Sequence, residues 1–198
     1  MAYTANTGFR YYKSIDANAS DPIPLMIKMA NSASARIGDL CRINTGGFIV
    51  PAASGEVLLG VITGFVDQDG KNVLGAGIEN KTGHTASGDD GVTTASDNQT
   101  RGKFIQAQVI VDFGGDILWK NKADGALAQT NLFQFFDVAT GRQVTVGSAS
   151  DSNGQVQLVQ LDPDSTGGAD ADSTQGLFRL NETITNAGVD TGTAKIAA

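Results

Sequence analysis

The residues best suited to chemistry in this chain are one cysteine, one histidine and several pairs of carboxylates. Cys41 lies in an alternating apolar run, Ile37–Ile43, whereas His84 lies in a segment that is almost entirely polar. A Cys–His pair acts as a nucleophile and base only when a rigid scaffold holds both side chains within hydrogen-bond reach. His84 has no apolar neighbours that could form such a scaffold. We therefore interpret Cys41 as a small buried hydrophobic residue and His84 as a surface residue.

The positions of the carboxylates indicate that they stabilise turns and do not form a metal site. A zinc site needs three or four ligands, which one Cys and one His cannot supply. The run Asp67-Gln-Asp69-Gly70 looks like a calcium loop, but its glycine stands at the wrong offset for an EF-hand and the closing glutamate is missing. The other acidic pairs stand in polar, turn-like segments, where Asp usually bonds to nearby backbone; they are Asp89–Asp90, Asp162–Asp164 and Asp170–Asp172. Since no phosphate-binding glycine motif is present either, the sequence predicts no cofactor, no metal and no enzymatic activity.

Composition excludes several other classes of function. The formal net charge is −7, and binding to phosphates needs a local excess of Lys and Arg, so nucleic acid is not an expected partner. No apolar run approaches the roughly 20 residues of a membrane helix. The N-terminus shows no charged segment followed by an apolar one, so no signal peptide is expected. The single cysteine also excludes an intramolecular disulfide.

The apolar residues occur in short runs bounded by Gly, Asn, Asp and Pro, which is typical of strands. Residues 103–113 are the best example, because Ile105, Ala107 and Val109 alternate with polar residues and should point inward. Two hairpins are predicted, one joining 38–43 to 48–50 and one joining 143–146 to 155–161. Helical periodicity is nearly absent. The predicted fold class is all-β, a compact barrel or sandwich with long polar loops and extended termini.

Two long polar segments, 82–102 and 162–176, contain almost nothing that could join a core. Loops of this length are usually functional or disordered. We therefore expect the first to project from the body and to become ordered in an assembly; the alternative is a hairpin folded back on the barrel. The domain organisation predicted is an arm or first strand at 1–15, one β domain at 16–181 and a polar tail at 182–198.

The N-terminal segment is the strongest candidate for partner contact. It concentrates aromatic residues, and aromatic side chains with polar tips are favoured at interfaces. An ordinary first strand is an equally good interpretation. The candidate contact residues are Tyr3, Phe9, Arg10, Tyr11 and Tyr12, together with Asp89 and Asp90 of the first polar segment.

Residues 38–64, GDLCRINTGGFIVPAASGEVLLGVITG, begin with Gly38-Asp39 and contain Leu59-Gly60-Val61. This arrangement resembles the small β-barrel decoration, or cement, proteins of tailed-phage heads, in which a strand entering at Gly-Asp is followed by a strand ending in Leu-Gly-Val. The resemblance implies a virion protein, assembled in the host cytoplasm, that lies on the capsid surface. It also implies that the major capsid protein is the partner and that the chain forms a homo-oligomer, with a trimer as one option.

Two alternatives remain open at this point. One is another virion component, such as a head-fibre base, a tail subunit or a fibre subunit. The other is a carbohydrate-binding, adhesive β module, for which exposed aromatic residues would be the sequence clue. The single tryptophan, Trp119, lies in the apolar run Ile117-Leu118-Trp119 and is predicted to be part of the core.

Overall fold

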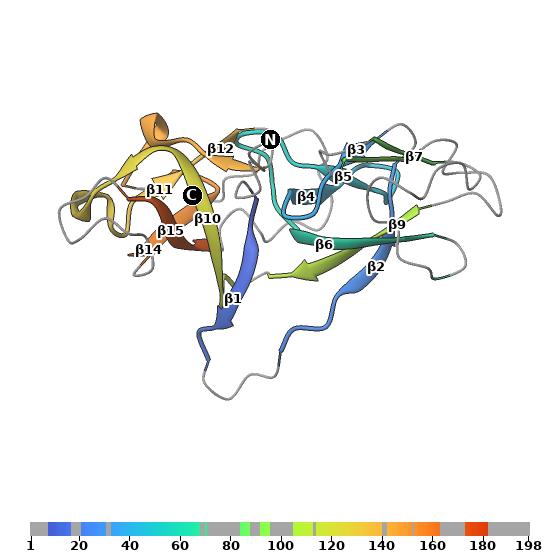
Figure 1. Cartoon of the computed structure of the whole chain (residues 1–198), viewed down its shortest axis with the longest axis horizontal. Helices are drawn as coiled ribbons and strands as arrows, with labels where there is room; N and C mark the ends of the chain where they lie inside the picture. Colours follow the sequence, from blue (N-terminus) through green and yellow to red (C-terminus); the bar gives the residue numbers. More distant parts are fainter. Residues whose placement is uncertain are drawn as a thin grey trace.

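The computed structural model describes residues 8–16, 21–30, 33–67, 70, 84–87, 92–95, 105–112, 114–139, 142–151, 153–162 and 173–181 of the 198-residue chain. Within these ranges the chain forms strands and two short 3-10 helices, Gln129–Asn131 (η1) and Val146–Ser148 (η2). The prediction of an all-β fold is confirmed. The strands form a five-stranded sheet, a seven-stranded sheet and a small three-stranded sheet (Figure 1).

The five-stranded sheet curls into a nearly closed barrel. Its strands, in spatial order, are β2 (Leu25–Lys28), β9 (Ile105–Val111), β6 (Gly60–Asp67), β4 (Leu40–Ile43) and β5 (Ile49–Pro51). A parallel bridge between Met29 and Ile49 joins the two ends of this order, and the Ala30 N–H donates to the Ile49 carbonyl over 2.9 Å. This single bridge brings the two ends of the order together at one point, so the barrel is nearly but not fully closed.

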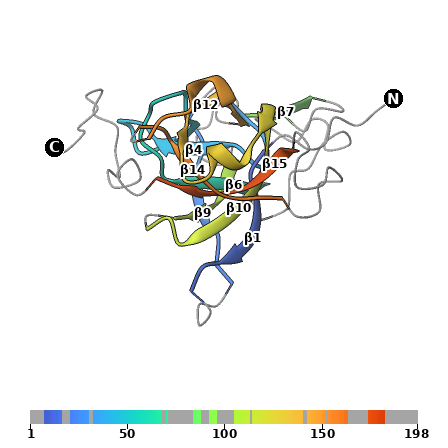
Figure 2. The same ribbon diagram turned by 90° about the vertical axis from the view of Figure 1, so that its left-hand side faces the viewer.

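The seven-stranded sheet lies beside the barrel, on the left in Figure 1 and towards the viewer in Figure 2. The path of the sheet is β11 (Phe135–Phe136), β14 (Val156–Leu161), β15 (Ser173–Leu180), β10 (Ile117–Leu127), β13 (Gln143–Val144) and β12 (Val138–Ala139). β1 (Arg10–Ser14) pairs with β10 in antiparallel register. Residues 10–14 therefore form a first strand, and residues 1–7 lie outside the described part.

The chain builds two hydrophobic cores that share one wall. Neighbouring residues of the barrel strands point to opposite cores, because side chains alternate along a strand. Val61 belongs to the core between the sheets and Ile62 to the core inside the barrel, and Leu40 and Cys41 divide in the same way. A strand that is buried on both faces needs a continuous apolar sequence. This explains why the run 57–65, VLLGVITGF, is the most apolar of the chain.

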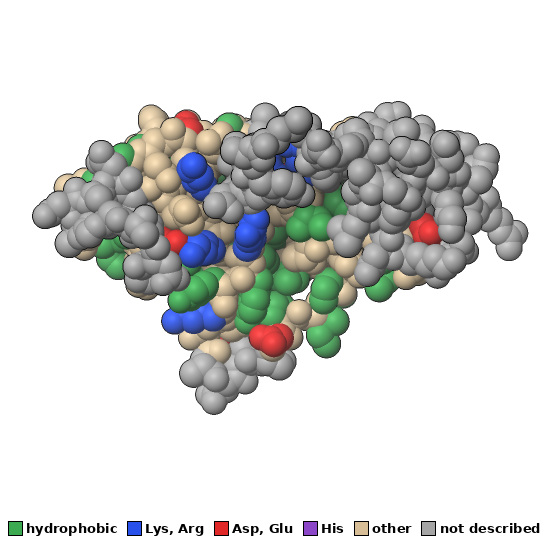
Figure 3. Space-filling view, in the orientation of Figure 1, with side chains coloured by type: hydrophobic (Ala, Val, Ile, Leu, Met, Phe, Trp, Pro, Cys, Tyr) green, Lys and Arg blue, Asp and Glu red, His purple; other side chains and the backbone are tan. Residues whose placement is uncertain are grey.

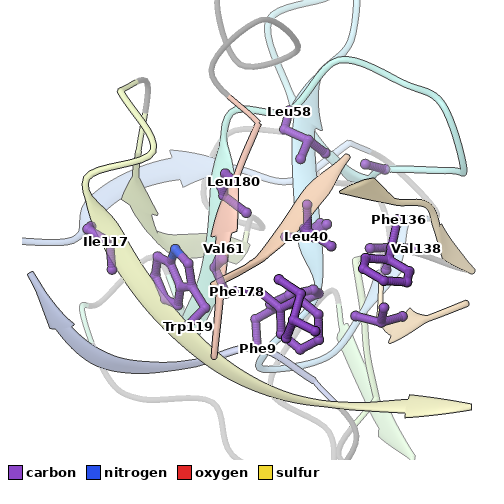
Figure 4. Packing of buried hydrophobic residues seen from close by; sticks show 14 of the residues in the cluster. Phe9, Leu40, Leu58, Val61, Ile117, Trp119, Phe136, Val138, Phe178 and Leu180 are labelled. Atoms are coloured by element: carbon purple, nitrogen blue, oxygen red, sulfur yellow. The ribbon is translucent and has the colours of Figure 1, made fainter. Parts of the chain in front are cut away.

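The core between the sheets is built around aromatic residues (Figure 4). Phe178 meets Phe9 and Phe136 edge to face, with ring centroids 6.3 and 6.4 Å apart. Trp119 is fully buried in this core, as predicted. Phe9 is only 2% exposed, so its side chain is part of the core and does not form the contact surface that the sequence suggested. The reason is its position just before β1, where it packs across the sheet onto Phe178.

One of the two predicted hairpins is confirmed and the other is wrong. β4 and β5 pair as expected, with Ile43 opposite Ile49. β14 does not pair with β13; instead it lies between β11 and β15, while β13 pairs with β10 and β12. Gly154 has a φ of 150° and sits so close to the backbone of Phe136 that a Cβ would overlap it. This glycine therefore lets the chain pass against β11, and does not close a hairpin.

The alternation predicted for residues 103–113 is confirmed at Ile105, Ala107 and Val109, which are buried inside the barrel. Ile110 on the other face is also buried, because that face packs against the core between the sheets. In the first polar segment, eight described residues form a hairpin, which agrees with the alternative given above and not with the expectation of a projecting segment. β7 (His84–Ser87) and β8 (Val92–Ala95) pair in antiparallel register, and β8 also pairs with β3 (Ser34–Ala35).

The second polar segment is shorter than expected at both ends. β15 begins at Ser173, so the strand takes the last four residues of the segment. Asp162 is buried and forms an ion pair with Lys120, whose Nζ lies 2.6 Å from the carboxylate. Residues 163–172 lie outside the described part, as do residues 88–91 between β7 and β8.

Candidate functional site: the β1–β2 surface

Cys41 has none of the properties of a reactive thiol. It is fully buried inside the barrel, and its Sγ donates to the carbonyl of Gly60 over 3.5 Å. Burial raises the pKa of the Cys41 thiol, and the nearby Asp39 carboxylate raises this pKa further. The thiolate, which is the nucleophilic form, is therefore suppressed. His84 lies in β7, in a different sheet from Cys41, and its side chain lies outside the described part.

The described residues contain no cluster of three or more His, Cys, Asp or Glu side chains that could hold a metal ion. Of the acidic pairs considered above, Asp67 is buried at the end of β6 and Asp162 pairs with Lys120. Their partners Asp69 and Asp164 lie outside the described part, as do both members of the other two pairs. Nor does the described part contain a helix with the length and apolar character needed to cross a membrane.

A buried polar junction joins the two sheets. The guanidinium of Arg142 donates to the Asp39 carboxylate over 2.7 Å and to the carbonyl of Ile37 over 3.0 Å. Asn121 extends the network, because its Oδ1 accepts from the Gly8 N–H and its Nδ2 donates to the Arg142 carbonyl. Burial raises the pKa of Asp39, and the Arg142 charge opposes this rise. The junction thus fixes the seven-stranded sheet against the barrel.

Asp112 closes the turn between β9 and β10. One of its carboxylate oxygens accepts from the Trp119 indole over 3.0 Å, and the other accepts from the Asp116 N–H over 2.9 Å. Burial raises the pKa of Asp112 above its usual value of 3.8, although both hydrogen bonds act in the opposite direction. Because the pKa of Asp112 is higher in the folded state than in the unfolded chain, its ionisation lowers the free energy of unfolding at pH values above the folded pKa. This loss disappears below the pKa of the unfolded chain.

We expect Asp112→Asn to flatten the pH dependence of stability. In the wild-type chain the Asp112 contribution lowers the free energy of unfolding as pH rises from about 3.8 through the folded pKa. The variant lacks that titration, so its urea midpoint should fall less over this range. The control is Asp151→Asn, which removes a charge from an exposed position. Equal slopes for the wild type and the Asp112 variant would contradict this assignment.

The most prominent surface feature is an apolar area at the tip of the molecule, over β1, β2 and the described residues that connect them (Figures 1 and 3). We call this the β1–β2 surface; its apolar members and their exposed fractions are Tyr12 43%, Ile15 49%, Ile23 85%, Leu25 54% and Met26 56%. Tyr11 ties the two segments together, because its hydroxyl donates to Asp21 over 3.1 Å. The remaining large exposed apolar residues among those described, Ile37 and Phe133, lie elsewhere.

Both strands at this surface have an edge that the described sheets leave largely unpaired. β1 pairs with β10 alone, and a bulge interrupts that pairing between Tyr11 and Lys13. β2 pairs with β9, and on its other side only the Met29 bridge reaches β5. Unpaired strand edges with apolar side chains are sites where another chain can bind. The β1–β2 surface is therefore the best candidate site for a partner.

The sequence located this surface only in part. Arg10 and Tyr12 are exposed on β1, while Tyr11 packs its ring edge to face against Trp119. Tyr3, Asp89 and Asp90 lie outside the described part. Sequence reasoning missed Ile23, Leu25 and Met26. The run 21–29, DPIPLMIKM, gave no signal of their exposure, because its consecutive apolar residues are also what a buried strand would show.

Comparison of this chain with protein-family models, with curated proteins and with solved structures found no match in any of the three.

Proposed function

We propose that this chain is a virion structural protein that decorates a phage capsid and stabilises it by bridging neighbouring capsid subunits. The observation that carries the proposal is the β1–β2 surface, because an exposed apolar area at unpaired strand edges marks a protein–protein contact. The resemblance of residues 38–64 to phage-head decoration proteins is the reason for naming the capsid as the partner. That segment forms β4, β5 and the first half of β6, three connected strands of the barrel.

The binding energy expected of this surface favours a protein that makes several repeated contacts rather than one isolated contact. Burying the exposed parts of its five apolar side chains would contribute on the order of 5 kcal/mol per copy. Association costs an estimated 4–15 kcal/mol in lost freedom of motion, so one such contact alone gives weak binding. Contacts repeated over a lattice, or combined in a homo-oligomer, raise the effective affinity without any new type of contact. A decoration protein meets this condition, since the major capsid protein presents many identical sites.

The proposal predicts that exposed apolar residues at the tip are needed for binding to the shell but not for folding. In the double variant Ile23→Ser with Met26→Ser, we expect at least a tenfold loss of affinity for undecorated heads. Its urea midpoint should stay close to that of the wild type, because substitutions at exposed positions rarely change stability by more than about 0.5 kcal/mol.

A matched control is Ile37→Ser with Phe133→Ser, which removes two exposed apolar side chains away from the tip. Binding should be measured by co-sedimentation of each purified chain with heads that lack it. Wild-type binding by the tip variant, or an equal loss in the control, would remove the β1–β2 surface from the proposal. Binding only to tails would favour another virion component, and binding only to glycans would favour an adhesive module.

A further inference from the structure

Phe133 is the most exposed aromatic residue in the described part of the chain, and its backbone adopts a conformation that favours glycine. Its side chain is 64% exposed, and its φ of 66° is the only positive value among the described residues other than glycine. A bulky residue in this left-handed region is an outlier, because its Cβ crowds the following carbonyl oxygen. The fold thus holds an aromatic ring in solvent at a position where a side chain is unfavourable.

The conformation of Phe133 arises from a tight turn between η1 and β11. The Gln134 N–H donates to the carbonyl of Asn131 over 3.1 Å, which closes a four-residue turn. Leu132 has a φ of −59° and a ψ of 135°, the angles of the first central residue of a type II turn. Phe133 is the second central residue, which needs a positive φ and is normally glycine or asparagine.

Three hydrogen bonds to β14 hold this turn in place. The Phe133 N–H donates to the carbonyl of Leu158 over 2.8 Å, and the Gln157 side chain donates to the Phe133 carbonyl over 2.8 Å. The Leu158 N–H donates to the carbonyl of Gln134 over 3.1 Å. Strained residues persist where the surrounding structure fixes them, and they cluster at binding sites. Glycine would form the same backbone hydrogen bonds without strain, so folding does not require the exposed ring.

Polar side chains next to Phe133 form a hydrogen-bonded row; we call Asn131, Gln134 and Asp151 the polar row. Asn131 Nδ2 donates to Gln134 Oε1 over 3.0 Å, and Gln134 Nε2 donates to Asp151 Oδ1 over 3.3 Å. Asn131 Oδ1 accepts from the Ala128 N–H over 2.8 Å, which fixes the start of the row. An amide nitrogen has two hydrogens and a carboxylate has two oxygens, so these groups can bind a ligand and keep the bonds that position them.

We propose that Phe133 and the polar row form a binding site for a saccharide, with the phenyl ring as the platform. The face of an aromatic ring is electron-rich, so it attracts the C–H groups on the apolar face of a pyranose. The hydroxyls of the sugar both donate and accept hydrogen bonds, as do the amides of the polar row, and the Asp151 carboxylate accepts them. Side chains already held in position lose little freedom when a ligand binds.

A protein contact is a poorer fit to these observations. The centre of a protein–protein interface is enriched in apolar side chains. Within residues 129–136, the other exposed residues are Gln129 and Thr130, and both are polar. An isolated aromatic ring among groups that form hydrogen bonds matches a sugar, which has an apolar face and a polar rim.

The saccharide site is separate from the β1–β2 surface. In the seven-stranded sheet, β14, β15 and β10 lie between β11, which follows the turn, and β1 (Figure 1). The saccharide site therefore does not rest on the proposed function. If the chain does decorate a capsid, many copies on one particle would raise its effective affinity for a surface covered with glycans.

The first test identifies the sugar and locates it on the chain. The full-length chain, biotinylated and displayed on streptavidin so that weak single-site binding is detected, is applied to an array of neutral and acidic oligosaccharides. The oligosaccharide bound best is then titrated into the nitrogen-15-labelled chain. We expect the largest amide shifts at residues 131–134 and 151. An array without bound saccharide, or the largest shifts in another part of the chain, would overturn the proposal.

The second test removes the ring without disturbing the turn. Phe133→Gly should lower the affinity for that oligosaccharide at least tenfold, whereas its urea midpoint should stay close to or above that of the wild type. Phe133→Tyr keeps the aromatic face and should bind within about twofold of the wild type. Gln134→Ala interrupts the polar row and should weaken binding about fivefold, the usual effect of losing one hydrogen bond.

The matched control is Ile37→Ser, which removes an exposed apolar side chain outside the polar row and should bind the oligosaccharide like the wild type. Unchanged binding by Phe133→Gly, or an equal loss in the control, would remove Phe133 from the site. A clear fall in the urea midpoint of Phe133→Gly would assign the ring to folding and contradict the proposal. The saccharide tests contain no heads and the co-sedimentation assay contains no saccharide, so either proposal can fail without the other.

Discussion

Gly60→Ala is expected to lower the free energy of unfolding by about 3 kcal/mol or more, the upper range for overpacking a well-packed core. A methyl group at this position would overlap the carbonyl oxygen of Ile110 in the neighbouring strand β9. Backbone atoms cannot move aside without separating β6 from β9. These two strands form the wall between the two cores, so their separation would disturb both cores together. Urea unfolding followed by tryptophan fluorescence measures the loss, since Trp119 reports on the core between the sheets.

The matched control is Gly64→Ala, four residues further along the same strand. Here the added methyl group would meet the side-chain oxygen of Gln108, the end of a flexible chain that can turn away. We expect a loss below about 1.5 kcal/mol, because the strand pairing stays intact. Similar losses for the two variants would show that β6 and β9 are not packed as closely as the structure has them.

Arg142→Ala is expected to have the second largest effect, a loss of about 3 kcal/mol. The Arg142–Asp39 pair is largely buried, with side chains 18% and 7% exposed. Removing the arginine leaves a buried carboxylate without its opposite charge, which typically costs 3–5 kcal/mol. It also removes the donors to the Ile37 carbonyl, which help hold the seven-stranded sheet to the barrel.

The control for this substitution is Arg42→Ala. Arg42 also forms an ion pair, with Glu56 over 2.8 Å, but both residues belong to the barrel side and the pair is more exposed. We expect a loss of about 1 kcal/mol or less, the usual value for a pair near the surface. If Arg42→Ala cost as much as Arg142→Ala, the junction would have no special role in joining the sheets.

Local patterns predicted the fold class and most of the strands, because period-two alternation and turn residues are properties of short segments. They failed where the strand order or the burial of a residue depends on pairing between segments far apart in the sequence. Residues 155–161 were expected to pair with their nearest preceding strand, yet they insert between β11 and the much later β15. The burial of Ile110 on the supposedly outer face has the same origin, since it depends on a second sheet that the local sequence does not show.

The candidate site was predictable to a smaller extent. Tyrosine and arginine near the N-terminus pointed to β1, and exposed Arg10 and Tyr12 do lie there. Burial of Phe9 could not be predicted, because it depends on contact with Phe178 at the other end of the chain. The apolar residues of β2 look in the sequence like any core strand. Only the open edge of the barrel shows that Leu25 and Met26 stay exposed.

An image of the intact virus particle by electron cryo-microscopy tests the central claim most directly. The proposed function predicts density for this chain on the outside of the capsid lattice, with the tip formed by β1 and β2 directed at the junction between capsid subunits. Density confined to the tail, or a lattice position in which that tip points to solvent, would contradict it.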